Sequence, residues 1–235
     1  MHAGDSIDVA NSRWEFKGHV VEQFDDHITK SVPLYSDGHS LILILSDFFV
    51  RDNSVCYDIG CSTGRLSYML ATRHDARRFV RVIGIEKEED MVKHAKRQYQ
   101  AGNLEFCCED IANIEFEKSQ LIISYYTLQF VEHKHRQAIV NRIYESLEKG
   151  AAFLMFEKVT AINSILQDVL NTAYFDFKVN NGYTYEEILA KAFSLKGVLM
   201  ANTTEKNIEL LTKAGFQELS VIMKYCNFEG YIAIK

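Results

Sequence analysis

The stretch VCYDIGCSTG at residues 55–64 decides the fold of this chain. Its bulky, partly β-branched first half is typical of a buried strand, and a helix-like segment follows it. Gly60 and Gly64 permit a sharp turn that brings bare backbone against a ligand. Cys61 and Ser62 stand where a pyrophosphate would require less side chain, so the loop departs from the Gly-x-Gly-x-x-Gly fingerprint. The stretch therefore predicts a ligand with an adenosine and no pyrophosphate.

Composition limits the classes of protein that this chain can belong to. With 235 residues, 47% of them hydrophobic, it can bury a large core, so we expect a single catalytic domain over residues 1–235. A net charge of −6 argues against nucleic acid as the partner. Five cysteines without zinc or redox spacing indicate reduced thiols. We find no secretory signal and no apolar stretch long enough for a membrane, and we expect a cytoplasmic protein.

Strand-like and helix-like segments alternate, which is typical of a parallel sheet with crossover helices. Strands are expected at residues 55–59, 80–85, 104–108, 121–125, 152–156, 216–223 and 227–234, and helices at 65–73, 88–100 and 135–148. Only a few residues separate the last two strands, so they should form an antiparallel hairpin. Five parallel strands and a terminal hairpin resemble the Rossmann-like, seven-stranded α/β fold of class I S-adenosylmethionine (SAM)-dependent methyltransferases.

Two helical regions lie outside this expected sheet. Residues 14–50 predict an N-terminal arm of one or two helices, in which Pro33 ends a helix at Lys30. Residues 162–215 predict three helices between the fifth and sixth strands, with breaks at Gly182 and Gly197. Enzymes of this architecture build their substrate cap from such an arm and insertion.

Three acidic residues end the first three strands, where ligands of parallel sheets bind. Asp58 is placed to orient the loop or to receive a cationic amino group. Glu86, with the adjoining Lys87, is placed to accept both hydroxyls of a ribose, because a carboxylate offers two acceptor oxygens in one plane. Asp110 and the amide of Ile111 are placed to recognise adenine. Each acid alone is also compatible with a helix cap or a solvated turn.

The chain resembles the carboxy-S-adenosylmethionine synthases, a family related to class I methyltransferases, from Trp14 to the C-terminus. The shared segments are Lys30-Ser31-Val32-Pro33-x-Tyr35-Ser36, Tyr57-Asp58-Ile59-Gly60-Cys61-Ser62, Thr127-Leu128-Gln129-Phe130, Arg136-Gln137-Ala138, Asp176-Phe177-Lys178, Asn181-Gly182-Tyr183 and Lys213-Ala214-Gly215-Phe216. The resemblance implies that Tyr35, Gly60 and Asp110-Ile111 contact SAM and that Glu86 binds its ribose. It also implies a homodimer in which the helical insertion contributes to the neighbouring site.

The chain departs from that family at positions close to the expected chemistry. An arginine that holds the transferred carboxylate in the family aligns with Ala192, which cannot pair with a carboxylate. Lys191 or Lys196 are the possible substitutes, although an ammonium does not reproduce a planar bidentate fork. An asparagine at the end of the fourth strand is replaced by Tyr125, and a His-His pair by Tyr174-Phe175.

These aromatic replacements suit a sulfonium, which carries positive charge but has no hydrogen to donate. Faces of Tyr125, Tyr126, Tyr174 or Phe175 would each attract it by about 0.5 to 2 kcal/mol, and ordinary core packing is the alternative for every one of them. His133 is a candidate general base or a solvated residue at a helix start. The His133-x-His135 spacing has no third ligand nearby, so we expect no metal site. Cys61 is a candidate nucleophile or packs under the turn.

Four functions remain open from the sequence. The first is a SAM-dependent methyltransferase acting on a small molecule. The second uses SAM as the sole substrate, with attack by its own amino group and release of methylthioadenosine. The third is carboxy-SAM synthesis, against which Ala192 stands. The fourth is a regulatory protein that binds SAM without turning it over.

Overall fold

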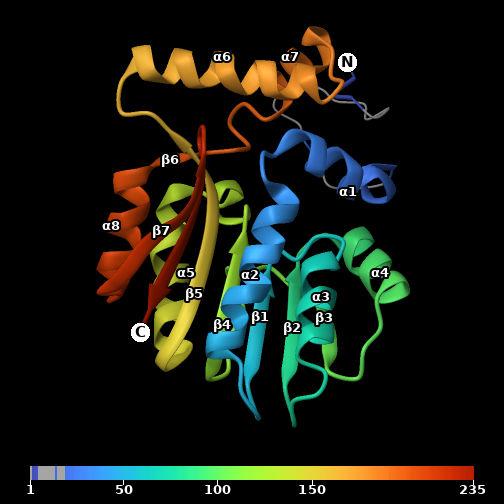
Figure 1. Ribbon diagram of the computed structural model, residues 1–235, viewed down its shortest axis with the longest axis vertical. Helices are drawn as coiled ribbons and strands as arrows, with labels where there is room; N and C mark the ends of the chain where they lie inside the picture. The colour runs from blue at the N-terminus through green and yellow to red at the C-terminus, as the bar shows by residue number, and fades with distance from the viewer. Residues whose placement is uncertain (1, 5–13, 15–18) are drawn as a thin grey trace.

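The computed structural model describes residues 2–4, 14 and 19–235, and a mixed sheet forms its centre (Figure 1). The strands are β1 (Val55–Ile59), β2 (Arg81–Glu86), β3 (Leu104–Cys108), β4 (Ser119–Tyr125), β5 (Leu147–Thr160), β6 (Asn202–Thr203), β7 (Glu218–Tyr225) and β8 (Phe228–Ile234). They follow the order β3-β2-β1-β4-β5-β8-β7, with β6 paired to β5. Strands β1 to β5 are parallel, and β8 is antiparallel to β5 and β7. The Rossmann-like fold with its terminal hairpin is confirmed, and β6 is an unpredicted addition.

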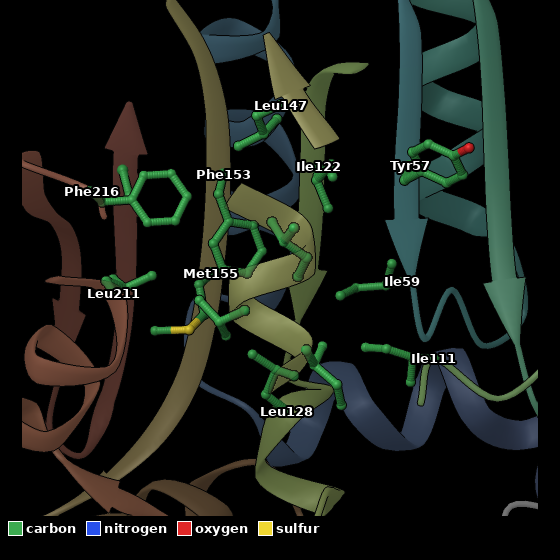
Figure 2. Close-up of a cluster of buried hydrophobic side chains, with 14 of the residues drawn as sticks. Tyr57, Ile59, Ile111, Ile122, Leu128, Leu147, Phe153, Met155, Leu211 and Phe216 are labelled. Carbon is green, nitrogen blue, oxygen red and sulfur yellow. The ribbon is translucent and has the colours of Figure 1, made fainter. Parts of the chain in front are cut away.

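Side chains alternate between the two faces of the sheet, as the period of a strand requires. On β5, Leu154 and Phe156 pack with α2 (Tyr35–Phe49) and α3 (Arg65–Arg73). Phe153 and Met155, which alternate with them, face α5 (His133–Ser146) and α8 (Thr204–Ala214). Figure 2 shows Phe153 and Met155 extending from β5 toward Phe216 and Leu211 on that second face. Two helical layers therefore bury the sheet and leave its strand ends for a ligand.

The N-terminal arm contains two helices that lie in different places. Helix α1 (His19–Ser31) ends one residue after the predicted position, and Pro33 follows in the break before α2. Helix α2 packs on the sheet through the fully buried Ile42, whereas α1 lies above the strand ends (Figure 1). Residues 15–18 of the expected arm lie outside the described residues.

The insertion also divides into two parts. Helices α6 (Ser164–Asn180) and α7 (Tyr185–Ser194) lie across the top of Figure 1, joined by a turn at Gly182 with a φ of 93°. Asn163 caps α6, and Thr184 forms a capping box with Glu187 at the start of α7. Helix α8 instead packs beside α5 at the sheet.

The remaining helices are α4 (Glu89–Gln98), which follows β2, and the short 3-10 helix η1 (Leu128–Phe130) after β4. No helix within the described ranges is long and apolar enough to cross a membrane.

Candidate functional site

The carboxyl ends of the parallel strands border a cavity of about 450 Å³. Helices α1, α6 and α7 contribute residues to its lining, and they lie above these strand ends in Figure 1. Most residues singled out from the sequence line it: Tyr35, Asp58, Gly60, Cys61, Ser62, Glu86, Lys87, Asp110, Ile111, Tyr125 and Tyr174. Segments far apart in the sequence thus meet around one space.

Three expected site residues lie away from the cavity wall. Gly64, with a φ of 83°, begins α3, and a Cβ there would lie 2.6 Å from the ring of Phe106. His133 is exposed in the first turn of α5. Phe175 is half-buried on α6, with the amine of Lys178 5.2 Å from its ring centroid. The structure gives Gly64 a packing role and does not bring the other two to the cavity.

The loop after β1, at residues 60–63, brings its backbone to the wall of the cavity. The Gly60 amide donates to the carbonyl of Ile85 at 2.7 Å, and its φ is 69°. A Cβ on Gly60 would lie 2.3 Å from Thr127, so only glycine fits there. Cys61 is buried, and burial raises the pKa of its thiol well above the usual range. The thiol therefore stays protonated and packs beneath the turn.

Glu86 connects this loop to the end of β2. One carboxylate oxygen, Oε2, accepts from the Ser62 amide at 3.1 Å. The other, Oε1, accepts from the amides of Lys87 at 2.8 Å and Glu88 at 3.0 Å. A carboxylate has about four acceptor positions, so these three bonds leave one on Oε2 for a ligand, and Glu86 lines the cavity. Burial is the main cause that raises the pKa of Glu86.

Asp58 is buried at the end of β1, where it accepts from the Ser67 hydroxyl at 2.6 Å. Burial raises its pKa to about 6, and the charge of Glu86 adds to the shift. Two carboxylates close together favour a positively charged ligand group between them.

Asp110 and Ile111 form the wall of the cavity beyond β3. Asp110 accepts from the Ala112 amide at 2.8 Å, which closes a turn. Arg142 of α5 donates to the carbonyls of Ile111 at 2.8 Å and Ile114 at 3.2 Å. Arg142 thereby fixes the loop that presents the Ile111 amide.

Aromatic rings wall the opposite end of the cavity. Ring centroids of Tyr35 and Tyr125 are 5.1 Å apart, and those of Tyr125 and Tyr126 are 4.8 Å apart. Tyr174 lies 5.1 Å and Tyr126 5.9 Å from Phe228. The Tyr125 hydroxyl donates to the Tyr35 carbonyl at 2.6 Å, which fixes its ring. Together these side chains, the aromatic wall, form a surface suited to a cation without hydrogen-bond donors.

One lysine lies beside this aromatic wall. The Lys158 amine lies 4.6 Å from the ring centroid of Tyr174, and burial lowers its pKa to about 8. Lys158 lines the cavity at the end of β5. No feature of the sequence singled it out, because a charged residue after an apolar run does not indicate a continuing strand.

Ala192 stands where the family resemblance implies an arginine, and the structure shows which neighbouring lysine could replace that arginine. Ala192 and Lys196 are exposed and do not line the cavity. Lys191 is buried on α7 and lines the cavity, where its amine donates to the Ser31 hydroxyl at 2.9 Å and bonds to His27 Nε2. Of the two substitutes weighed from the sequence, only Lys191 therefore reaches the ligand space.

Hydrogen bonds connect helix α1 to the loop after β1 and to the insertion. The Thr63 hydroxyl donates to Asp25 at 2.7 Å, which connects α1 to the loop after β1. The Tyr174 hydroxyl of α6 donates to the Ser31 carbonyl at 2.8 Å.

His39 of α2 is a further lining residue that the sequence did not reveal. Its ring centroid lies 4.7 Å from that of Tyr125, and burial lowers its pKa to about 3, so the imidazole is neutral. Its Nε2 has no hydrogen-bond partner within the described part of the chain.

Comparison with known proteins places this chain in a family. A methyltransferase-domain family model matches residues 56–150. The carboxy-S-adenosyl-L-methionine synthase of Staphylococcus epidermidis is 36% identical over 95% of this chain and 97% of its own length. That of Nautilia profundicola is 34% identical over 95% of each chain. This chain belongs to the carboxy-SAM synthase family. It is accordingly a SAM-dependent transferase in the class I methyltransferase superfamily.

Solved structures show the same fold at low sequence identity. A SAM-dependent methyltransferase from Methanosarcina mazei is 20% identical, with a TM-score of 0.60 over 82% of this chain and 96% of that one. Human N-acetylserotonin methyltransferase in complex with SAM is 15% identical, with a TM-score of 0.55 over 94% of this chain and 63% of that one.

Proposed function

We propose that this chain binds SAM in the cavity and catalyses methyl transfer from its sulfonium to a small molecule. The observation that carries the proposal is the aromatic wall of Tyr35, Tyr125, Tyr126, Tyr174 and Phe228. Aromatic faces attract the sulfonium and offer no nucleophile that would compete with the methyl acceptor. They also exclude water from the reacting atoms. Catalysis then comes mainly from placing the attacking atom in line with the carbon–sulfur bond.

The rest of the cavity supports a defined orientation of SAM. The remaining acceptor position of Glu86 would take a ribose hydroxyl, and Asp110 with the Ile111 amide would bind adenine. The buried Asp58 would receive the amino group, because burial leaves this carboxylate in need of a positive partner. The sulfonium would then lie between the loop and Tyr125.

The size of the cavity supports a second candidate, in which SAM is the sole substrate. Small-molecule sites range over about 300 to 1,000 Å³, and a volume of about 450 Å³ leaves little room beside one drug-sized molecule. The amino group of SAM would form a carbon–nitrogen bond as a carbon–sulfur bond breaks. The amine would lose a proton, and methylthioadenosine would leave.

The names of the relatives support a third candidate, carboxy-SAM synthesis. Ala192 stands against it, because it cannot replace the arginine that the family resemblance implies. The position of Lys191 in the cavity supports it, since an ammonium can still bind a carboxylate.

Product analysis separates the three candidates. Purified protein is incubated with SAM alone, with a set of small-molecule acceptors, and with prephenate, and the products are identified by mass. S-adenosylhomocysteine that forms only with an acceptor supports methyl transfer. Methylthioadenosine from SAM alone supports the second candidate, and prephenate-dependent carboxylated SAM supports the third; either result overturns methyl transfer.

We also propose that the chain forms a homodimer through the cap. Ile165 and Val169 of α6 are 76% and 58% exposed, and Leu189 and Phe193 of α7 are each 48% exposed. Residues four apart lie on one face of a helix, so each helix presents an apolar stripe. Exposed stripes of this kind support burial against a second copy.

A further inference from the structure

Arg136 of α5 is a buried cation that lies outside the cavity. The residue is 2% exposed and does not line the cavity. Within the described residues, none of the ion pairs includes Arg136. Its guanidinium donates instead to backbone carbonyls: Nε donates to Val131 at 2.9 Å, and Nη2 donates to Gln129 at 3.3 Å and to Met200. A buried guanidinium therefore joins two segments that are distant in the sequence.

The first of these segments, residues 127–131, follows β4 and borders the cavity. Its 3-10 helix η1 spans only three residues, and a helix this short is not stable by itself. Four of the five residues line the cavity: Thr127, Gln129, Phe130 and Val131. The Thr127 hydroxyl also donates to the Ile59 carbonyl at 2.9 Å, next to the loop after β1. The position of this segment therefore affects the wall of the cavity in two places.

The second segment is the end of the helical insertion. Residues 195–203 connect α7 to α8, and Met200 lies among them. The Met200 amide donates to the Gln129 carbonyl at 2.8 Å, and the Met200 carbonyl accepts from Arg136. Residues 200–203 do not line the cavity. The insertion is thus attached to the segment after β4 at a point away from the ligand.

The shape of the Arg136 side chain is what these bonds require. A guanidinium holds its N–H donors in one rigid plane, so it can fix two carbonyls of one segment and a third carbonyl of another. A lysine carries the same charge but lacks this geometry. Burying the charge is itself costly, so these bonds contribute more to the position of the two segments than to overall stability.

We propose that Arg136 is a positioning residue that holds the segment after β4 and the end of the insertion together, so that ligand binding and docking of the insertion strengthen each other. This inference rests on the proposed function, which supplies the ligand. It adds a residue outside the cavity to those that determine how tightly the cavity binds. Because coupling is reciprocal, a ligand that favours the docked arrangement must also stabilise residues 200–203.

Amide hydrogen exchange on the full chain tests the inference, because it measures local opening segment by segment. Arg136→Met should speed exchange at residues 128–131 and 200–203 by roughly 10- to 100-fold, since hydrogen bonds from a charged group are lost. Arg136→Lys should have nearly the same effect. It keeps a positive charge beside the buried Glu157, whose carboxylate interacts with Arg136, and it replaces the first variant if that one fails to fold.

Arg142→Met is the matched control for exchange. Arg142 also lies on α5 and also donates to two backbone carbonyls, those of Ile111 and Ile114. Its replacement should speed exchange at residues 110–114 and leave residues 128–131 and 200–203 unchanged.

The same measurement with SAM present tests the coupling. In the wild-type chain, SAM should slow exchange at residues 200–203. In Arg136→Met this protection should disappear, while SAM still slows exchange at residues 60–63. The affinity for SAM in calorimetric titration should fall by about 5- to 150-fold, the usual range of coupling between sites.

Three results would overturn the inference. The first is unchanged exchange at both segments in Arg136→Met, and the second is faster exchange spread evenly over the sheet, which indicates only a loss of overall stability. The third is wild-type exchange in Arg136→Lys, which would show that charge alone is required. Failure of the wild-type chain to bind SAM would reject the proposed function instead, and exchange in the free protein would still decide whether Arg136 holds the two segments.

Discussion

Replacing Glu86 by glutamine tests how the end of β2 holds a ligand. The carboxamide oxygen can keep the bonds from the Lys87 and Glu88 amides, which are 2.8 and 3.0 Å long in the wild-type chain. Its amino group then replaces the oxygen that accepts from Ser62 at 3.1 Å and that would accept from the ligand. One hydrogen bond between a charged group and the ligand is lost, which costs about 1.5 to 3 kcal/mol. The affinity for SAM should therefore fall by about 10- to 100-fold.

The stability of this variant should change much less than its affinity. The lost bond from Ser62 lowers the free energy of unfolding. Removing a carboxylate whose pKa burial has raised increases that free energy, so the two effects oppose each other. Calorimetric titration with SAM measures the affinity, and thermal unfolding of the free protein measures stability. Glu89→Gln is the control, because Glu89 is exposed on α4 and pairs with Lys93. Unchanged SAM affinity in Glu86→Gln would refute the placement of the ribose.

Three further changes test other parts of the structure. Gly64→Ala should lower the free energy of unfolding by about 2 to 4 kcal/mol through its left-handed backbone and the crowded Cβ, as chemical denaturation would show. Gly102→Ala, whose Cβ meets open space, should be nearly neutral, and equal effects would contradict the packing role of Gly64. Asp58 has a folded pKa of about 6 against a usual 3.8, so its contribution to stability falls by about 3 kcal/mol as pH rises through this window. Asp58→Asn should remove that dependence in denaturation measured from pH 4 to 7, and an unchanged profile would reject the assignment. Val169→Glu should convert the expected dimer to a monomer in light scattering, and a persisting dimer would place the interface elsewhere.

The sheet could be predicted because each strand is marked by a pattern of neighbouring residues in the sequence. Strand β1 and helix α3 occupy the predicted residues, since a compact apolar run and a glycine loop mark their limits. Strand β5 was predicted to end at residue 156 and runs to Thr160, because the charged pair Glu157-Lys158 does not have the pattern of a strand. The two residues of β6 are too few to show any period.

The site residues at the strand ends could be predicted from the sequence. The contacts made by the covering helices α1, α6 and α7 could be predicted much less well. The acids at the strand ends follow from strand limits, and all of them line the cavity. Contacts such as that of Lys158 with Tyr174 join segments distant in sequence and have no local pattern. His133 illustrates the same limit, because its place at a helix start did not indicate which way the side chain points.

The hydrogen bond between Asp25 and Thr63 can affect the residence time of a ligand without changing the contacts that set its affinity. It connects the covering helix to the loop beneath, so a ligand that leaves the cavity on the side of α1 does so only after this bond breaks. The dwell time of the ligand is then governed partly by a bond that need not touch it. Sequence changes along α1 can therefore tune the exchange of substrate and product while the binding surface stays the same.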